Sequence, residues 1–108
     1  MKIVVDRDEL VQVDDLDNFR SFKIVCDAAL DAGDLSRALA GLATVIDDGA
    51  AAWVVRDALL QRLPEPPSAN WLKSFGKMIE TAARFGWVNA SYGTVRAHVE
   101  RRDVSGAR

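Results

Sequence analysis

The sequence predicts an α+β fold, a small single domain of helices and short strands with a long C-terminal helix followed by a β-hairpin. Three observations favour this class. Residues 70–86 repeat apolar side chains at the spacing of a helix. Residues 87–100 contain two strand-like runs, separated by a turn that includes Asn89 and Gly93. Short β-branched runs, of which residues 2–5 are the first, precede these elements.

The length of 108 residues is sufficient for one hydrophobic core, which we assign to residues 1–103. The tail at residues 104–108 is expected to fray. The apolar fraction of 49 % and the charged fraction of 28 % are typical of a soluble globular protein. No apolar run approaches the roughly 20 residues of a membrane span. Because no signal peptide opens the chain and Cys26 is the only cysteine, we expect a cytoplasmic protein without an internal disulfide.

Two short apolar runs open the chain, at residues 2–5 and 10–13. The charged residues 6–9 between them are typical of a turn, so this segment is interpreted as a β-hairpin. Two strands this short are unstable alone, so we expect them to lie on further structure.

Residues 16–33 support two interpretations. The spacing of their apolar side chains favours a helix, with Asp14 or Asp15 as its cap. The run at residues 22–26 also fits a strand, because Ile24 and the valine after it are β-branched. The sequence leaves both open.

The middle of the chain is predicted to contain a helix, a strand and a second helix. Asp34 is expected to cap a helix that continues to Ile46. Residues 50–55 form a short apolar run typical of a buried strand, and residues 56–63 resume helical spacing. The proline-rich residues 64–68 cannot continue a helix and are predicted to be an extended connector.

The helix predicted at residues 70–86 is the longest element. Its start can be capped by Ser68 or Asn70, and Gly86 supplies a left-handed stop. Its polar side is expected to carry Ser74, Lys77, Thr81 and Arg84. Its core-facing side is expected to carry Trp71, Leu72, Phe75, Met78, Ile79, Ala82, Ala83 and Phe85.

The two halves of the chain differ in charge. Residues 1–50 contain eleven acidic and five basic residues, a net charge of −6, while residues 51–108 contain five acidic and nine basic residues, a net charge of +4. This layout is able to steer a partner or drive self-association, although two solvated faces of unlike sign would also produce it.

From Asp34 onward the predicted order is helix, strand, helix, helix, strand, turn, strand. This order resembles the winged-helix fold, in which the third helix is often the reader of DNA, and residues 89–93 would then be the wing. The proline-rich link is longer than the usual tight turn of that fold, and the residues before Asp34 have no place in a minimal winged helix. The ending from Gly86 to Glu100 is similar to that of small bacterial proteins with no assigned function.

Nucleic-acid binding is the first chemistry that this resemblance suggests. The polar side of the long helix offers Lys73, Lys77 and Arg84, and the hairpin adds Arg96. Phosphate neutralisation by such cations dominates affinity for DNA. Against this interpretation, Glu80 lies one helical turn from two of these cations, and the pI of about 5.3 is below that of domains that bind DNA alone.

His98 is the only histidine and lies in a strand beside Arg96 and Glu100, which share its face. This arrangement suits acid–base chemistry or anion binding, and equally an exposed histidine with no chemical role. No second ligand is spaced for a metal site, and no cofactor motif occurs. Cys26 lies in an apolar run and is expected to be a buried, inert thiol.

The chain contains three tryptophans, Trp53, Trp71 and Trp87, which are a heavy aromatic load for this length. Core packing explains them most simply. Alternatively, they line an apolar pocket for a small organic ligand, with Tyr92 and His98 at its mouth, or they form an exposed patch at a subunit interface.

These observations favour a non-catalytic protein-interaction or regulatory module, which we expect to be a cytoplasmic homodimer that binds itself or another protein. The alternatives are a winged-helix-like DNA-binding regulator and a small ligand-binding protein or enzyme with a Trp-lined pocket near His98. The candidate binding residues are Lys73, Lys77, Arg84, Trp87, Tyr92, Arg96 and His98.

Overall fold

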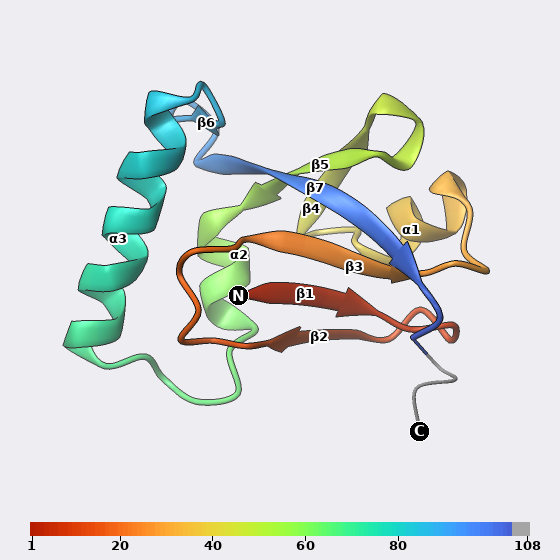
Figure 1. Cartoon of the computed structure of the whole chain (residues 1–108), viewed down its shortest axis with the longest axis horizontal. Coiled ribbons are helices and arrows are strands. Elements are labelled where there is room, and N and C mark those ends of the chain that lie inside the picture. The colour runs from red at the N-terminus through yellow and green to blue at the C-terminus, as the bar shows by residue number, and fades with distance from the viewer. Residues whose placement is uncertain (105–108) are drawn as a thin grey trace.

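A seven-stranded mixed β-sheet organises the molecule, and three α-helices pack against it (Figure 1). These elements belong to residues 1–104, which the computed structural model describes. The strands are β1 (Lys2–Val5), β2 (Val11–Asp14), β3 (Lys23–Asp27), β4 (Ala43–Ile46), β5 (Ala51–Val55), β6 (Val88–Asn89) and β7 (Thr94–Arg102). The helices are α1 (Ala32–Ala38), α2 (Arg56–Gln61) and α3 (Ala69–Arg84), with a short 3₁₀ turn at Asp47–Gly49. The predicted α+β class is confirmed.

The last strand of the sequence, β7, is central to the sheet. The strand order is β2-β1-β3-β7-β5-β4, so β7 lies between β3, to which it is parallel, and β5, to which it is antiparallel. The short β6 pairs with Thr94 and Val95 of β7. On the same edge of β7, the pairing with β3 begins at His98. Neither β6 nor β3 therefore pairs with Arg96 and Ala97 of β7 on this side.

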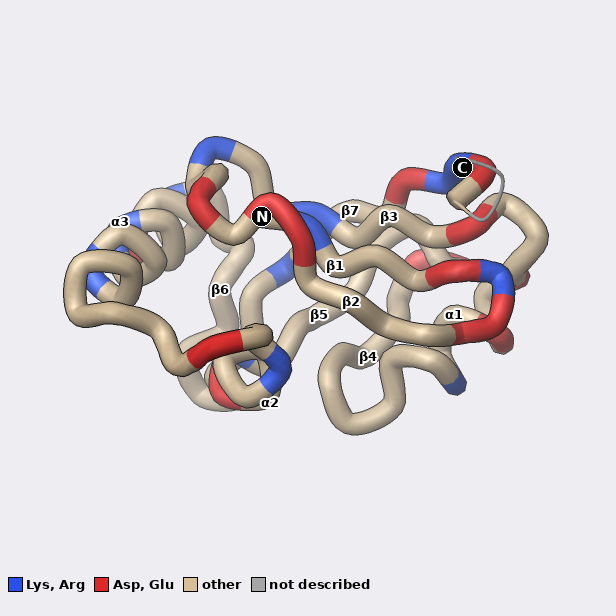
Figure 2. Tube along the Cα trace, turned by 90° about the horizontal axis from the view of Figure 1, so that it is seen from below, with Lys and Arg blue, Asp and Glu red and all other residues tan. Residues whose placement is uncertain are grey.

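The helices α1 and α2 cover one face of the sheet, and α3 stands at the end of the sheet where β1, β3 and β7 begin (Figures 1 and 2). On the covered face, Ile3, Ile24 and Ala97 pack with Leu35 of α1 and Leu59 of α2, all nearly inaccessible to solvent. Burial of such side chains is the main favourable term in folding.

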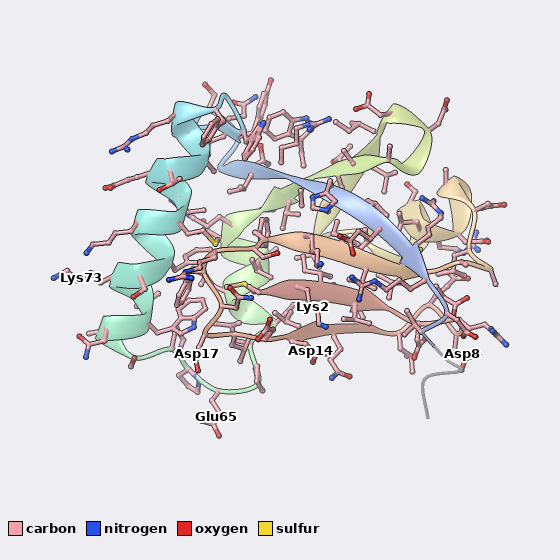
Figure 3. All side chains as sticks on the ribbon, in the orientation of Figure 1. Lys2, Asp8, Asp14, Asp17, Glu65 and Lys73 are labelled. Atoms are coloured by element: carbon pink, nitrogen blue, oxygen red, sulfur yellow. The ribbon has the colours of Figure 1, made fainter. Side chains whose placement is uncertain are left out.

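No helix of the described residues lies over the other face of the sheet. Lys2 and Asp14, directly opposite each other on β1 and β2, both belong to this open face (Figure 3). The sheet is therefore apolar on one side and largely polar on the other, as an antiparallel or mixed sheet allows.

Helix α3 forms as predicted and packs mainly through Phe75, which is buried. Ser68 is the cap, since its Oγ accepts a hydrogen bond from the Trp71 backbone N–H at 3.1 Å. Gly86 follows the helix with a φ of +77°, the left-handed conformation that glycine adopts without steric cost.

The predicted apolar side of α3 was too wide. Trp71, Met78 and Ile79 pack against the core, but Leu72 and Phe85 are 43 % and 63 % exposed. Only a narrow stripe is covered because α3 packs at the end of the sheet rather than flat on its face.

The helix predicted to run from Asp34 to Ile46 is wrong in both bounds. Helix α1 ends at Ala38, and Ala43–Ile46 is the edge strand β4, antiparallel to β5. Gly41, with a φ of +84°, makes the turn between them. Asp31 rather than Asp34 is the cap, while Asp34 completes a capping box from the third helical position.

Of the two interpretations of residues 16–33, the strand is confirmed for Lys23–Asp27 and the helix begins only at Ala32. Ile24 and Val25 are both buried although they face opposite sides, because β3 lies between β1 and β7. The predicted cap at Asp14 or Asp15 is wrong. The chain turns there instead, with the Asn18 N–H donating to the Asp15 carbonyl at 3.1 Å.

The remaining predicted elements agree with the structure: the hairpin β1–β2, the buried strand β5, the helix α2, the proline connector and the hairpin β6–β7. The winged-helix likeness is not confirmed, because β7 belongs to the centre of a large sheet. Within residues 1–104, no helix has the length and apolar character that crossing a bilayer requires.

The tail was predicted to fray from residue 104 onward. The Val104 N–H donates to Oδ2 of the buried Asp27 at 3.1 Å, which ties this residue to β3. Residues 105–108 lie outside the described part of the chain.

Candidate ligand-binding groove

A groove of about 580 Å³ lies between α3, the segment that leads into β3, and the start of β7. This volume is within the range of about 300–1,000 Å³ that small-molecule sites occupy. Its apolar lining consists of Phe19, Phe22, Met78, Ala82, Trp87 and Val95. Its polar lining consists of Arg20, Ser74, Lys77, Thr81 and Arg96.

One wall of the groove follows from the helical repeat of α3. Ser74, Lys77, Met78, Thr81 and Ala82 are spaced by three and four residues, so they share one side of the helix. This side lies at the border between the buried stripe around Phe75 and the solvent-exposed surface. The wall therefore combines apolar and polar side chains along its length.

The opposite wall is made by the pairing pattern of β7. The Arg96 N–H donates to the Trp87 carbonyl at 2.7 Å, which continues the antiparallel register of β6 and β7 by one residue. This bond holds Trp87 beside the groove. The Trp87 ring also stacks on Phe85, with centroids 4.8 Å apart and planes at 22°.

The third wall is the segment before β3, which carries Phe19, Arg20 and Phe22. The Phe19 ring packs edge-on against Trp71 at 5.4 Å, and Trp71 in turn stacks on Phe75 at 5.1 Å. The Trp71 indole N–H donates to the Leu16 carbonyl at 3.0 Å. These contacts fix this segment against the core.

The charged groups of the groove are all cationic. Arg20, Lys77 and Arg96 line it, and no carboxylate is among its lining residues. Arg96 reaches Asp47 of the β4–β5 turn, with its Nη2 3.1 Å from the Oδ2 of that residue. Arg20 and Lys77 are in no ion pair within the described part of the chain, so the groove is electropositive.

Three of the seven residues predicted to bind something line the groove: Lys77, Trp87 and Arg96. Lys73 points away from the sheet on the outer side of α3 (Figure 3), and Arg84 lies in the last turn of the helix. Neither is a lining residue.

The other two predicted residues lie elsewhere on the hairpin. Tyr92 is 77 % exposed in the β6–β7 turn. His98 is exposed on the open face of the sheet. Of the three tryptophans, only Trp87 lines the groove; Trp53 lies on β5 opposite Arg96 of β7.

Sequence reasoning did not name eight of the eleven lining residues as binding residues, and three of these, Phe19, Arg20 and Phe22, form one wall of the groove. They lie in the stretch that the sequence left open between helix and strand. The available signal was an arginine between two phenylalanines, three residues apart, directly before a β-branched run. This pattern indicates a groove wall only when β3 is known to begin at Lys23.

Around His98, one carboxylate is shared by several basic side chains. Glu100 accepts hydrogen bonds from Lys23 at 3.2 Å and Arg102 at 2.5 Å, and His98 Nε2 lies 3.3 Å from its Oε1. These contacts, that with His98 first, lower the pKa of Glu100 to about 2. Glu100 therefore stays ionised at neutral pH and ties β3 to β7.

Cys26 is buried, and its burial raises the pKa of the thiol, which keeps it protonated at neutral pH. Its thiol donates weakly to the Asp27 carbonyl at 3.4 Å. Among the described residues, no three His, Cys, Asp or Glu side chains gather closely enough to hold a metal ion. The groove is therefore the site with the clearest chemical character.

Two other hollows lie near the β2–β3 loop. One, of about 390 Å³, is lined by Trp71 and the proline connector. The other, of about 630 Å³, is lined by strand β2 and by Asp14, Asp15 and Asp17. Neither hollow has both several aromatic side chains on its walls and unpaired charges of one sign.

No protein-family model, no curated protein and no solved structure matches this chain.

Proposed function

We propose that the protein is a non-catalytic binding protein that holds a small organic ligand in the groove beside α3. The observation that carries the proposal is the groove itself, with a volume of about 580 Å³, aromatic side chains on two walls and a few polar groups among them. Ligand sites are typically apolar clefts with a small number of polar groups that fix orientation.

The lining supports binding rather than catalysis. Its hydroxyl groups belong to Ser74 and Thr81, and Lys77 is the lining residue that could act as a base. No hydrogen bond joins the Lys77 ammonium to either hydroxyl within the described part of the chain. Thr81 is already engaged, since its Oγ1 donates to the Lys77 carbonyl at 3.1 Å. A hydroxyl group that is not hydrogen-bonded to a base is a weak nucleophile at neutral pH.

The test compares two substitutions at neighbouring positions of α3. Ala82 lines the groove, whereas Ala83 is exposed on the helix. Ala82→Trp should fill the groove, and Ala83→Trp adds the same side chain outside it. The measurement is a titration with 2-naphthol, followed by ¹H–¹⁵N correlation spectra of the amide groups.

In the wild-type protein and the Ala83→Trp variant, we expect saturable shifts confined to amides around the groove. In the Ala82→Trp variant, affinity should fall at least tenfold. Shifts scattered over the surface, or equal binding by both variants, would remove the support for a groove ligand.

Self-association is a second candidate function, favoured by the exposed aromatic side chains at the end of the molecule near β6. Phe85 and Tyr92 are 63 % and 77 % exposed, and Phe85 stacks on Trp87. Aromatic side chains are enriched at protein interfaces. A homodimer that joins two copies through this end accords with the sequence-based expectation.

Sedimentation velocity tests this second candidate. The wild type should sediment as a dimer, and the double substitution Phe85→Ser with Tyr92→Ser should yield a monomer. Leu10→Ser is the matched control, because Leu10 is an equally exposed apolar residue in the β1–β2 turn. A wild-type protein that is monomeric at every concentration would contradict the dimer.

DNA binding has less support. Lys77 lines the groove, which leaves Lys73 and Arg84 as the cations of α3 outside it, and the pI of about 5.3 opposes attraction to phosphates. A cytoplasmic setting stays a prediction.

A further inference from the structure

The groove is lined by positive charges, although the whole chain has a net negative charge. The protein has 16 acidic and 14 basic residues, yet the groove is lined by three cations and no acid. These cations come from three separate elements: Arg20 precedes β3, Lys77 is on α3, and Arg96 is on β7. Their convergence is therefore a product of the fold and not of a basic stretch in the sequence.

The three cations differ in how far they are neutralised. Arg96 has a carboxylate partner in Asp47, at 3.1 Å. Arg20 and Lys77 have none among the described residues, and they lie on different walls of the groove. An anion between these walls would gain two charged donors that have no other ionic partner among the described residues.

The walls that flank these cations are aromatic. Phe19 and Phe22 lie on one wall and Trp87 lies near the other, with the Phe19 and Trp87 rings each held by a neighbouring ring. Aromatic rings prefer stacked or edge-to-face contacts with another ring, and rings fixed in place lose little freedom on binding. The apolar part of the lining therefore suits a planar ring.

We infer that the groove takes a small aromatic carboxylate, an inference that rests on the proposed function. The ring lies among Phe19, Phe22 and Trp87. The two carboxylate oxygens accept hydrogen bonds from the Lys77 ammonium and the Arg20 guanidinium, and Arg96 adds to the positive potential. A cationic ligand of the same shape is excluded by charge.

A series of three compounds with the same ring system tests the inference: naphthalene-2-carboxylate, naphthalene-2-carboxamide and 2-naphthylmethylammonium. Affinities are measured by calorimetry, and the site is located by amide shifts. The carboxylate should bind at least tenfold more tightly than the amide, and the ammonium compound most weakly. Raising the salt concentration should reduce the preference for the carboxylate, since exposed charges are screened.

A pair of variants assigns the preference to the groove. Lys77→Met keeps most of the aliphatic stem but removes the charge, and should weaken carboxylate binding about fivefold while leaving amide binding unchanged. Lys73→Met is the matched control one turn earlier on α3, outside the groove, and should change neither affinity. Amide spectra of both variants confirm that they are folded.

The outcomes separate the inference from the proposed function. If carboxylate and amide bind equally, with shifts confined to the groove, the carboxylate inference is overturned and the ligand groove stands. A preference for the ammonium compound likewise overturns the inference alone. If none of the three compounds binds at the groove, both fall.

Discussion

The two ends of strand β7 handle charge in opposite ways. Toward its C-terminal end, Glu100 is surrounded by Lys23, His98 and Arg102, so each charge has a partner. At its beginning, β7 borders a groove lined by Arg96, which pairs with Asp47, and by Arg20 and Lys77, which have no acidic partner among the described residues. The paired charges join β3 to β7, whereas the unpaired cations of the groove are the groups that the proposed ligand would contact.

The first prediction concerns how the groove end is held in place. Phe75→Ala should lower the free energy of unfolding by about 3–5 kcal/mol, because the buried ring anchors α3 to the core. Urea unfolding followed by circular dichroism measures this change. Leu72→Ala, on the partly exposed side of the same helix, is the control and should cost less than about 1 kcal/mol. Equal losses would mean that α3 does not depend on its buried stripe.

The second prediction reverses one charge of the groove. Lys77→Glu should weaken binding of naphthalene-2-carboxylate by about tenfold or more, which corresponds to about 1.4 kcal/mol. The reason is that a carboxylate would then face the anion in place of an ammonium group. Calorimetry measures the affinity. Lys73→Glu changes the net charge of the protein equally but lies outside the groove, so an equal loss in both variants would point to a general charge effect.

The third prediction concerns Glu100, near the C-terminal end of β7. The folded pKa of Glu100, about 2, is below its ordinary value of 4.5, so its contribution to stability is complete above pH 4.5 and is lost as the pH falls through about 2. Glu100→Gln should therefore be less stable than the wild type at pH 6, by an amount that shrinks toward pH 2. Denaturant midpoints at several pH values measure this. A difference that does not change with pH would show that the carboxylate charge is not what matters.

A second pH measurement concerns ligand binding at the groove. Its lining holds no carboxylate, and naphthalene-2-sulfonate stays ionised throughout. The affinity of the groove for naphthalene-2-sulfonate should therefore be the same at pH 6 and pH 4.5. Glu100 also stays ionised over this range.

The smallest effect is expected at the ion pair between Arg96 and Asp47. Asp47→Asn should change stability by no more than about 1 kcal/mol, because the Arg96–Asp47 pair is exposed. Asn also tolerates the left-handed conformation of position 47, where φ is +53°. With Arg96 released, affinity for naphthalene-2-carboxylate should rise about twofold to threefold, as calorimetry would show. A lower affinity would mean that Asp47 positions Arg96 for binding.

The elements that the sequence predicted correctly are those that local signals determine. Helix α3 has a long apolar repeat, a serine cap and a glycine stop, and the hairpins carry turn residues between β-branched runs. Residues 43–46 were mistaken for helix because Ala43 and Ile46 continue the helical spacing of Leu35 and Leu39. The pairing of β4 with β5 decided otherwise, and spacing along the chain does not report such pairing.

Only part of the groove lining was predicted, because the rest depends on contacts between distant segments. Lys77, Trp87 and Arg96 were named because they lie on elements whose faces the sequence indicates. Arg20 was missed because it lies in a segment whose course is set by contacts of Phe19 with Trp71, more than fifty residues away. That the cations would converge could not be read from the sequence, since it depends on the position of β7 between β3 and β5.

That position has a consequence for how the chain acquires its structure. Before residues 94–102 are available, the sheet consists of two separate pieces, β2-β1-β3 and β5-β4, and β3 and β5 each present an unpaired edge. Open edges of this kind pair readily with other chains. Because the joining strand follows the other strands of the sheet in the sequence, a chain emerging from the ribosome carries both edges until residues 94–102 have been made, so aggregation of nascent chains competes with folding.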